Sequence, residues 1–310
     1  MTDVQNFGAM PTQKGSIRIF RLFEIDVYLH WSWFLILLYV IQLRDNSDSS
    51  LALNILGLLT LFVIVLMHEF GHALACKQVG GQANQIVLWP LGGVAYVAPP
   101  QRPGAMLWSI AAGPLVNVVL FAGATIILLL GTASGLSSQL PFLWSYIGIV
   151  GYINLILLKF NLLPIFPLDG GQILRSLLWF KCGKARSMMI ASIIGFIGIA
   201  IMIPYVIAQN NSWYYILAVF IGFNCWNGFR HAQALSRIAK IPRREGFACP
   251  SCKSAPPLGA LWRCGKCGNA FDTFLTQGIC PHCGTQFPTT QCLDCGTSSP
   301  IGDWSASSQQ

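Results

Sequence analysis

The chain reads Leu58-Leu59-Thr60-Leu61-Phe62-Val63-Ile64-Val65-Leu66-Met67-His68-Glu69-Phe70-Gly71-His72 where a long apolar run ends in three ionisable residues. The apolar part is typical of the interior of a transmembrane helix. On a helix, residues four apart share a face, so His68 and His72 can bind one zinc ion while Glu69 lies beside its water. Ionisable residues at membrane depth cost about 3 kcal/mol each and usually serve a function. The stretch therefore predicts a hydrolase that cuts inside a bilayer or at its edge.

The composition is that of a polytopic membrane protein. Of the 310 residues, 54% are hydrophobic and 10% are charged, and the mean hydropathy is +0.57. A soluble globular protein carries about 25% charged residues. The polar start of the chain lacks the layout of a cleavable signal peptide, so the first apolar segment is expected to stay as an anchor. Six segments are long enough to span a bilayer, namely residues 25–43, 52–79, 106–130, 142–163, 187–208 and 213–229.

The distribution of charge predicts the orientation of these segments. The net charge of +8 would suggest nucleic-acid binding in a soluble protein, but Lys and Arg also gather at the cytoplasmic ends of membrane helices. Here they cluster before the first segment, in the second and fourth connections and after the sixth segment. The pattern predicts that both termini are cytoplasmic and that the second and fourth segments end on that side.

A third metal ligand is expected after the fourth segment. A catalytic zinc ion needs three protein ligands and an open position for water. The best candidate is Asp169, in Asn161-Leu162-Leu163-Pro164-Ile165-Phe166-Pro167-Leu168-Asp169-Gly170-Gly171, because topology places it on the same side as His68 and His72. The alternative is that Asp169 caps the helix that follows it. The shared side of the membrane favours the ligand.

With both motifs in order, the chain resembles the site-2 proteases, a family of intramembrane zinc metalloproteases. That family pairs His-Glu-x-x-His on one membrane helix with Asn-x-x-Pro-x-x-x-Leu-Asp-Gly on a later one. The resemblance covers about residues 20–230 and includes Gly113-Pro114-Leu115-Val116-Asn117 and Pro90-Leu91-Gly92-Gly93. The positions that match the two main motifs are His68, Glu69, His72, Asn161, Pro164, Leu168, Asp169 and Gly170.

The resemblance implies a fold and a mechanism. The fold is an all-α polytopic membrane protein with about six transmembrane helices. A catalytic zinc held by His68, His72 and Asp169 would activate a water, and Glu69 would carry its proton to the leaving amine. Asn161 and Asn117 are expected to position the substrate backbone. The substrate would be a single-span membrane protein in the lipid bilayer, cut in regulated intramembrane proteolysis, in a prokaryotic plasma membrane.

Residues 87–97 surround a Gly-Gly turn and are rich in β-favouring side chains. They could form a hairpin whose edge pairs with an extended substrate, since a transmembrane helix must unwind before its carbonyls can be attacked. They could equally form a membrane-dipping loop that only shields the site. The residues alone leave both interpretations open.

After residue 245 the composition changes to that of a zinc-binding domain. Four Cys-x-x-Cys pairs predict two structural zinc ions in tandem zinc ribbons, a small cytosolic β domain. Disulfides are the competing interpretation, but they need an oxidising compartment, and topology places this tail in the cytoplasm. Sequence does not fix which pairs share a metal, although sequential pairing is the shortest. The pairs are Cys249/Cys252, Cys264/Cys267, Cys280/Cys283 and Cys292/Cys295.

The expected domain organisation follows from these shifts in composition. Residues 1–21 form a cytosolic segment, 22–240 the membrane metalloprotease domain, 246–297 the ribbons and 298–310 a disordered tail. From residue 246 onward the chain has three basic and three acidic side chains, so the tail lacks the basic patch of a nucleic-acid-binding domain. A cytosolic protein partner, or regulation of access to the membrane site, is the expected role.

Two other function classes compete with an endopeptidase. A metal-handling transporter could use His68, His72 and Asp169 as a transit site. It would not need a general base, so Glu69→Gln should spare transport and abolish cleavage. A catalytically silent scaffold would depend on its ribbons, and removing residues 246–310 would then be more damaging than Glu69→Gln.

Overall fold

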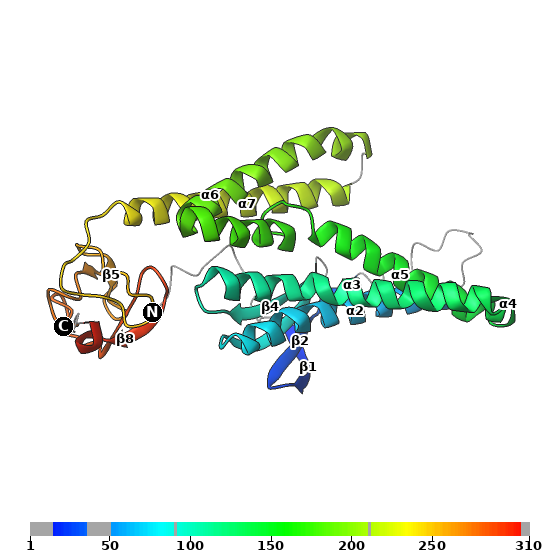
Figure 1. The fold of residues 1–310 in the computed structure, drawn as a ribbon, viewed down its shortest axis with the longest axis horizontal. Coiled ribbons are helices and arrows are strands. Elements are labelled where there is room, and N and C mark those ends of the chain that lie inside the picture. Colours follow the sequence, from blue (N-terminus) through cyan, green and yellow to red (C-terminus); the bar gives the residue numbers. More distant parts are fainter. Residues whose placement is uncertain (1–14, 36–50, 90–91, 210–211, 305–310) are drawn as a thin grey trace.

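The computed structural model describes residues 15–35, 51–89, 92–209 and 212–304. It is mostly helical, and four of its helices (α2, α3, α5 and α6) are long and apolar enough to cross a membrane. In Figure 1, α2, α3 and α5 lie along one another, α6 and α7 form a second layer, and the cysteine-rich domain lies at one end. The helices are α2 (Leu51–Gln78), α3 (Pro103–Ala133), α4 (Leu136–Gln139), α5 (Pro141–Asn161), α6 (Asp169–Gln209) and α7 (Ser212–Ala239).

These helices cover the second to sixth expected segments. The expectation of a mostly helical membrane domain is thus confirmed. α6 contains both the stretch after Asp169 and the fifth segment, and it bends at Gly183, whose φ of 79° is not helical. Only a residue without a β-carbon adopts that conformation readily, so the glycine permits the bend.

The first expected segment begins as a strand and not as the predicted membrane helix. Its start, β2 (Ile25–His30), is a strand that pairs with β1 (Ser16–Leu22), and residues 36–43 lie outside the described part. The physical reason is a period of two: Ile25 and Val27 are fully buried, whereas Asp26 between them binds Arg18 at 2.7 Å. The boundary expected after residue 21 is therefore also wrong, because β1 belongs to the sheet of the membrane domain.

A four-stranded sheet packs against α2. Its order is β1-β2-β3-β4, with β3 (Gln82–Trp89) parallel to β2 and antiparallel to β4 (Gly92–Ala98). The apolar face of the sheet contacts Val65, Ala73 and Cys76 of α2. β3 and β4 pair as the predicted hairpin does, but Gly92 and Gly93, which were expected to form its turn, are the first two residues of β4. Residues 90–91 lie outside the described part. β4 is an edge strand of this sheet, and both β3 and β4 contact the expected catalytic helix, α2.

The cysteine-rich domain is built from one local motif used four times. In each Cys-x-x-Cys pair the first cysteine's carbonyl accepts a hydrogen bond from the residue after the second cysteine. That residue has a positive φ, and it is a glycine in three pairs and Lys253 in the other. Two of the motifs form the loops of short hairpins: Cys264/Cys267 lies between β5 (Trp262–Arg263) and β6 (Ala270–Phe271), and Cys292/Cys295 lies between β7 (Thr289–Gln291) and β8 (Ser298–Pro300).

The end of the chain is ordered further than expected. Disorder from residue 298 is contradicted by β8 and by the 3₁₀ helix η1 (Ile301–Trp304). Trp304 is 1% exposed, packs on Phe274, and its carbonyl accepts a hydrogen bond from Ala248. The polar composition concealed one buried aromatic side chain, whose burial stabilises the segment by about 2 kcal/mol. Residues 305–310 lie outside the described part.

Candidate metal centres

Three side chains from two helices meet at one point inside the membrane domain. His68 and His72 lie on one face of α2, and Asp169 is the first residue of α6. Asp169 Oδ2 lies 3.0 Å from His68 Nε2 and 3.4 Å from His72 Nε2, and the two Nε2 atoms are 3.0 Å apart. The structure therefore brings the three predicted ligands together, although Asp169 follows the two histidines by about a hundred residues in the chain.

The start of α6 is held in place by two glycines. A β-carbon on Gly170 would lie 2.3 Å from the Leu162 carbonyl oxygen, and one on Gly171 would lie 2.5 Å from Ile165. Any larger residue would push the first turn of α6 away from the loop that precedes it. The glycines thus fix the position from which Asp169 reaches the two imidazoles.

The protonation of the two imidazoles follows from their other ring nitrogens. His68 Nδ1 lies 2.6 Å from Asn117 Oδ1, and His72 Nδ1 lies 2.9 Å from the Ser109 carbonyl oxygen. Both partners are acceptors, so both Nδ1 atoms carry hydrogen, and in the neutral form of each ring Nε2 presents a lone pair. Asp169 Oδ2 is buried and has no hydrogen-bond donor. Three electron-rich atoms therefore face one another.

A cation stabilises such a group. A shared proton could satisfy one pair of these atoms, whereas a metal ion contacts all three. Zinc bonds to nitrogen and oxygen of about 2.1 Å, at tetrahedral angles, place ligand atoms about 3.4 Å apart. The observed separations of 3.0–3.4 Å and the two-imidazole, one-carboxylate donor set fit zinc. The hydrogen bonds from each Nδ1 also match the outer contacts that orient histidine ligands.

Glu69 lies between this centre and the edge of the sheet. It is 7% exposed, and its Oε2 accepts a hydrogen bond of 2.8 Å from the backbone N–H of Ala95 in β4. A β-carbon on Gly93 would lie 2.3 Å from Glu69 Cγ, so only glycine lets β4 approach the carboxylate this closely. The hydrogen bond thus places the edge strand β4 beside Glu69 and next to the metal centre.

α3 packs closely against the two imidazoles at Gly113. A β-carbon on Gly113 would lie 2.3 Å from His72 Nε2 and 2.8 Å from His68 Nε2. On the neighbouring turn of α2, a β-carbon on Gly71 would lie 2.7 Å from the Ala112 carbonyl oxygen. Small residues thus let α2 and α3 pack backbone to backbone beside the ligands.

The two asparagines expected to position substrate have different surroundings. Asn117 is fully buried, and it accepts from His68 and donates to Asn154 Oδ1 at 3.2 Å. Its contacts orient a ligand, which differs from the expected contact with substrate. Asn161 ends α5, is partly buried, and is not among the described neighbours of the three ligand atoms. Sequence reasoning missed Asn154, although an asparagine two turns before the end of an apolar helix was a visible signal.

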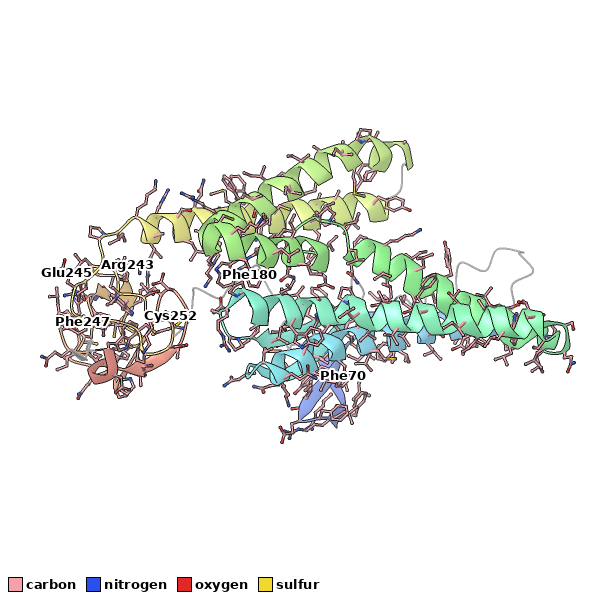
Figure 2. The ribbon with its side chains drawn as sticks, viewed as in Figure 1. Phe70, Phe180, Arg243, Glu245, Phe247 and Cys252 are labelled. Atoms are coloured by element: carbon pink, nitrogen blue, oxygen red, sulfur yellow. The ribbon has the colours of Figure 1, made fainter. Side chains whose placement is uncertain are left out.

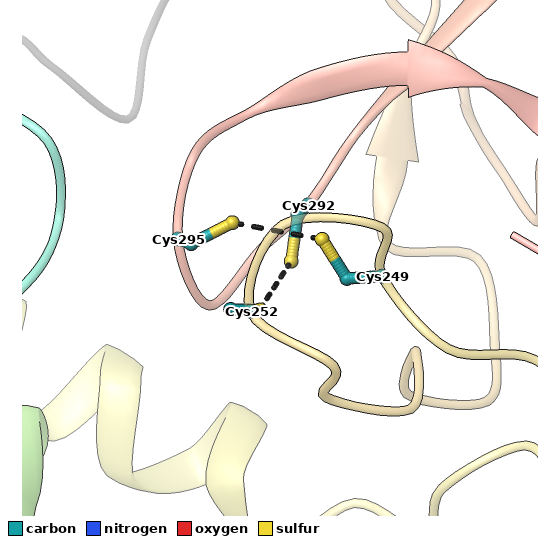
Figure 3. A group of neighbouring side chains, drawn as sticks. All are labelled: Cys249, Cys252, Cys292 and Cys295. Carbon is teal, nitrogen blue, oxygen red and sulfur yellow. Dashed lines mark hydrogen bonds between the residues drawn. The ribbon is translucent and has the colours of Figure 1, made fainter. Parts of the chain in front are cut away.

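The eight tail cysteines form two groups, and the pairing is nested. The outer set consists of Cys249, Cys252, Cys292 and Cys295, and the inner set of Cys264, Cys267, Cys280 and Cys283. Figure 3 shows the outer set converging from two loops, one with Cys249 and Cys252 and the other with Cys292 and Cys295. The shorter, sequential pairing is therefore not adopted. All of these cysteines are free thiols.

The sulfur positions fit zinc. Neighbouring sulfurs lie 3.7 Å apart in the outer set and 3.5 and 3.7 Å apart in the inner set. Zinc–sulfur bonds of about 2.3 Å at tetrahedral angles require about 3.8 Å. In the inner set, hydrogen bonds from Thr285 lower the pKa of Cys283 to about 6, which favours the thiolate that a metal needs.

The chain is similar in sequence to one protein family and to proteins named as zinc metalloproteases. The family model described as peptidase family M50 matches residues 56–143 and 129–205. Zinc metalloprotease MJ0392 of Methanocaldococcus jannaschii is 33% identical over 227 residues, which are 73% of this chain and 62% of that protein. A relative from Synechocystis, sll0528, also bears the words zinc metalloprotease in its name; it is 34% identical over 240 residues, 71% of this chain and 61% of its own. The chain thus spans less than two thirds of these relatives. A solved site-2 protease from Methanocaldococcus jannaschii matches 74% of this chain and 99% of its own, with 27% identity and a TM-score of 0.46.

Proposed function

Because the chain belongs to peptidase family M50, the site-2 protease family, we propose that it is an intramembrane zinc endopeptidase that cleaves transmembrane segments of membrane-anchored regulatory proteins. The observation that carries the proposal is the meeting of His68, His72 and Asp169 beside the buried carboxylate of Glu69. A zinc site used only for structure would have no reason to place a fourth ionisable group next to its ligands and leave it outside the ligand set.

Different residues of the chain have different roles in the proposed hydrolysis. When bound, zinc supplies a Lewis acid and lowers the pKa of water from 15.7 to about 7. Glu69 accepts the proton of the attacking water and returns it to the leaving amine. Its hydrogen bond from Ala95 holds one carboxylate oxygen in place and leaves the other free for this transfer. Asn117 and the Ser109 carbonyl keep both imidazoles in the tautomer that ligates metal. Asn161 remains a candidate for positioning substrate.

The free edge of β4 is the proposed docking site for an unwound substrate. An extended segment that pairs with this edge gives up its helical hydrogen bonds and presents its carbonyls. Glu69 already bonds Ala95 on the same edge, so a strand added there would place a peptide bond next to the carboxylate. A loop that only shields the site would not need a regular edge strand at the catalytic residue.

The proposed topology places both termini and the metal centre toward the cytoplasm of a prokaryotic plasma membrane. It rests on the clusters of Lys and Arg described above and on four apolar helices among the described residues. Cleavage near that side would release the cytosolic part of a substrate. A cytosolic protein is the proposed partner of the tail domain.

The proposed metal content is three zinc ions per chain. We expect elemental analysis of the purified protein to give three for the wild type and two for His72→Ala, since loss of one ligand opens the membrane site. Replacing Cys292 and Cys295 by Ser is expected to give two as well, because the outer set then loses half its ligands. Two zinc ions in the wild type, with no further loss in His72→Ala, would contradict a catalytic zinc.

Asn117→Ala is expected to weaken the membrane zinc site without removing a ligand. The imidazole of His68 would lose the acceptor that fixes its tautomer, and such outer contacts are worth about 10- to 100-fold in metal affinity. Zinc release to a competing chelator measures the change. Asn224→Ala is the matched control, because Asn224 bonds only the Phe220 carbonyl of its own helix. Equal release from the two variants would leave Asn117 without this role.

The proposed function is tested by comparing membrane proteomes of cells that make the wild type or Glu69→Gln at equal levels. We expect short membrane-anchored fragments to accumulate only with Glu69→Gln, and the fragments would name the substrates. Matching proteomes under several stresses, together with no cleavage of test helices by the purified protein, would reject the endopeptidase and favour a scaffold that acts through its tail domain.

A further inference from the structure

The outer cysteine set lies against the membrane domain. Asp294 sits between two of its ligands, and its carbonyl oxygen accepts a hydrogen bond of 3.2 Å from Lys184 Nζ of α6. A β-carbon on Gly296, one residue past the set, would lie 3.8 Å from Gln101 Cγ. Gln101 lies in the connection between β4 and α3. The segment 292–296 therefore touches two parts of the membrane domain that are far apart in sequence.

Positive side chains surround this segment. Arg243, which follows α7, binds both carboxylate oxygens of Asp294 at 2.6 and 3.2 Å and lies within electrostatic range of Cys292 and Cys252. Figure 2 shows Arg243 at the start of the tail domain. Lys184 lies within the same range of Cys292 and Cys295. Both cations are thus placed beside the outer set.

A further cation lies behind them and has no counter-ion. Arg175 is 7% exposed, its Nε has no acceptor, and it shares the ring of Trp179 with Lys184 at 5.9 and 5.7 Å. Among the ion pairs of the described residues, neither Arg175 nor Lys184 takes part. Burial, with these two cations nearby, lowers the pKa of His231 to about 4. Arg175 therefore has no described carboxylate partner, and Lys184 has only the nearby carboxylate of Asp294, which also pairs with Arg243. Positive charge exceeds negative charge in this region, which is costly for partly buried groups.

The outer set carries its full negative charge only when it holds metal. Four thiolates and one zinc ion carry a net charge of −2, whereas four protonated thiols carry none. The contacts of Lys184 and Gln101 involve the outer set, because Asp294 lies within its second motif and Gly296 follows that motif. Opposite charges that are close together and partly buried attract one another more strongly than exposed pairs do.

We propose that Lys184, Arg175 and Arg243 form a receptor for the metal-loaded outer set, so that the tail domain docks on the membrane domain when this site holds zinc and separates when it is empty. Docking fixes Gln101, and through it the β4 edge beside Glu69. The metal state of a cytosolic site would then govern how firmly the substrate edge is held. This last consequence rests on the proposed function, whereas the docking itself does not.

Hydrogen exchange of the full-length, zinc-loaded protein in lipid nanodiscs tests the docking. Lys184→Glu leaves every cysteine in place and sets a negative charge against the site. We expect it to speed exchange of the amides in residues 101–106 and 293–297 by about tenfold, because a charged hydrogen bond and its attraction are lost. Lys181→Glu is the matched control, since Lys181 is exposed on the same helix. Equal exchange in the two variants would overturn the proposal.

A second variant tests the dependence on metal. Replacing Cys292 and Cys295 by Ser removes the charge of the outer site and is expected to give the same faster exchange at residues 101–106. Protection that persists there without the outer metal would also overturn the proposal. Exchange requires no turnover, so either failure would reject the docking and leave the endopeptidase to be judged by Glu69→Gln.

Discussion

Purified Glu69→Gln is expected to cleave a transmembrane test peptide about 10³-fold more slowly than the wild type while it retains all of its zinc. The amide has nearly the shape of the carboxylate but cannot accept the proton of the attacking water, and general-base catalysis is worth about 10²- to 10⁴-fold. Glu69 is not among the three atoms that converge on the metal position, so the zinc content should not change. Initial rates and elemental analysis on the same preparation give both quantities.

Glu245→Gln is the control for this prediction, because it makes the same chemical change at an exposed position in the segment that precedes the tail domain. We expect it to match the wild type. If Glu69→Gln kept more than about a tenth of the wild-type rate, Glu69 would not be the general base. If it lost zinc instead, its role would be that of a ligand or of a support for the ligands.

Gly113→Ala is expected to lower the cleavage rate by about 10²-fold and to reduce zinc occupancy of the membrane site. The added methyl group would lie 2.3 Å from His72 Nε2, so the imidazole or α3 must move. Misplacing a catalytic group by about 1 Å costs about that factor. The rate and the zinc stoichiometry would be measured together, since a shifted imidazole affects both.

Gly123→Ala is the matched control, because Gly123 lies on the same helix and a β-carbon there meets nothing within 4 Å. The two variants add the same methyl group to the same kind of backbone. A Gly113→Ala protein with wild-type rate and full zinc would show that α3 is not packed against the imidazoles. Because overpacking costs about 1–3 kcal/mol, the thermal stability of both variants should be compared as well.

Sequence predicted the site better than the scaffold around it. His68 and His72 have a helical spacing, and Asp169 follows from topology, so local pattern and charge were sufficient to name the residues that converge. The contacts of Asn117 with His68 and Asn154 could not be predicted in the same way. They depend on the rotation of α3 and α5 about their axes, which packing decides.

The first segment shows why apolar content alone misled. Residues 25–43 are mostly apolar, but Ile25 to His30 alternates between apolar and polar side chains, which suits a strand with partners on both sides. One of these partners, β3, comes about sixty residues later in the chain. The nested zinc pairing failed for another reason. The four cysteine motifs have the same spacing and the same local hydrogen bonds, so only the packing around Trp262, Phe274 and Trp304 distinguishes their partners.

Nesting has a consequence for how the tail domain is made. The inner set closes a loop of about twenty residues and is complete as soon as Cys283 has left the ribosome, whereas the outer set must wait for Cys295. The entropy of closing each loop grows only slowly with its length, so the order of synthesis, more than the size of the loop, sets the order of closure. A growing chain would thus acquire a folded inner half first, and the outer zinc ion would be bound only after Cys295 has followed.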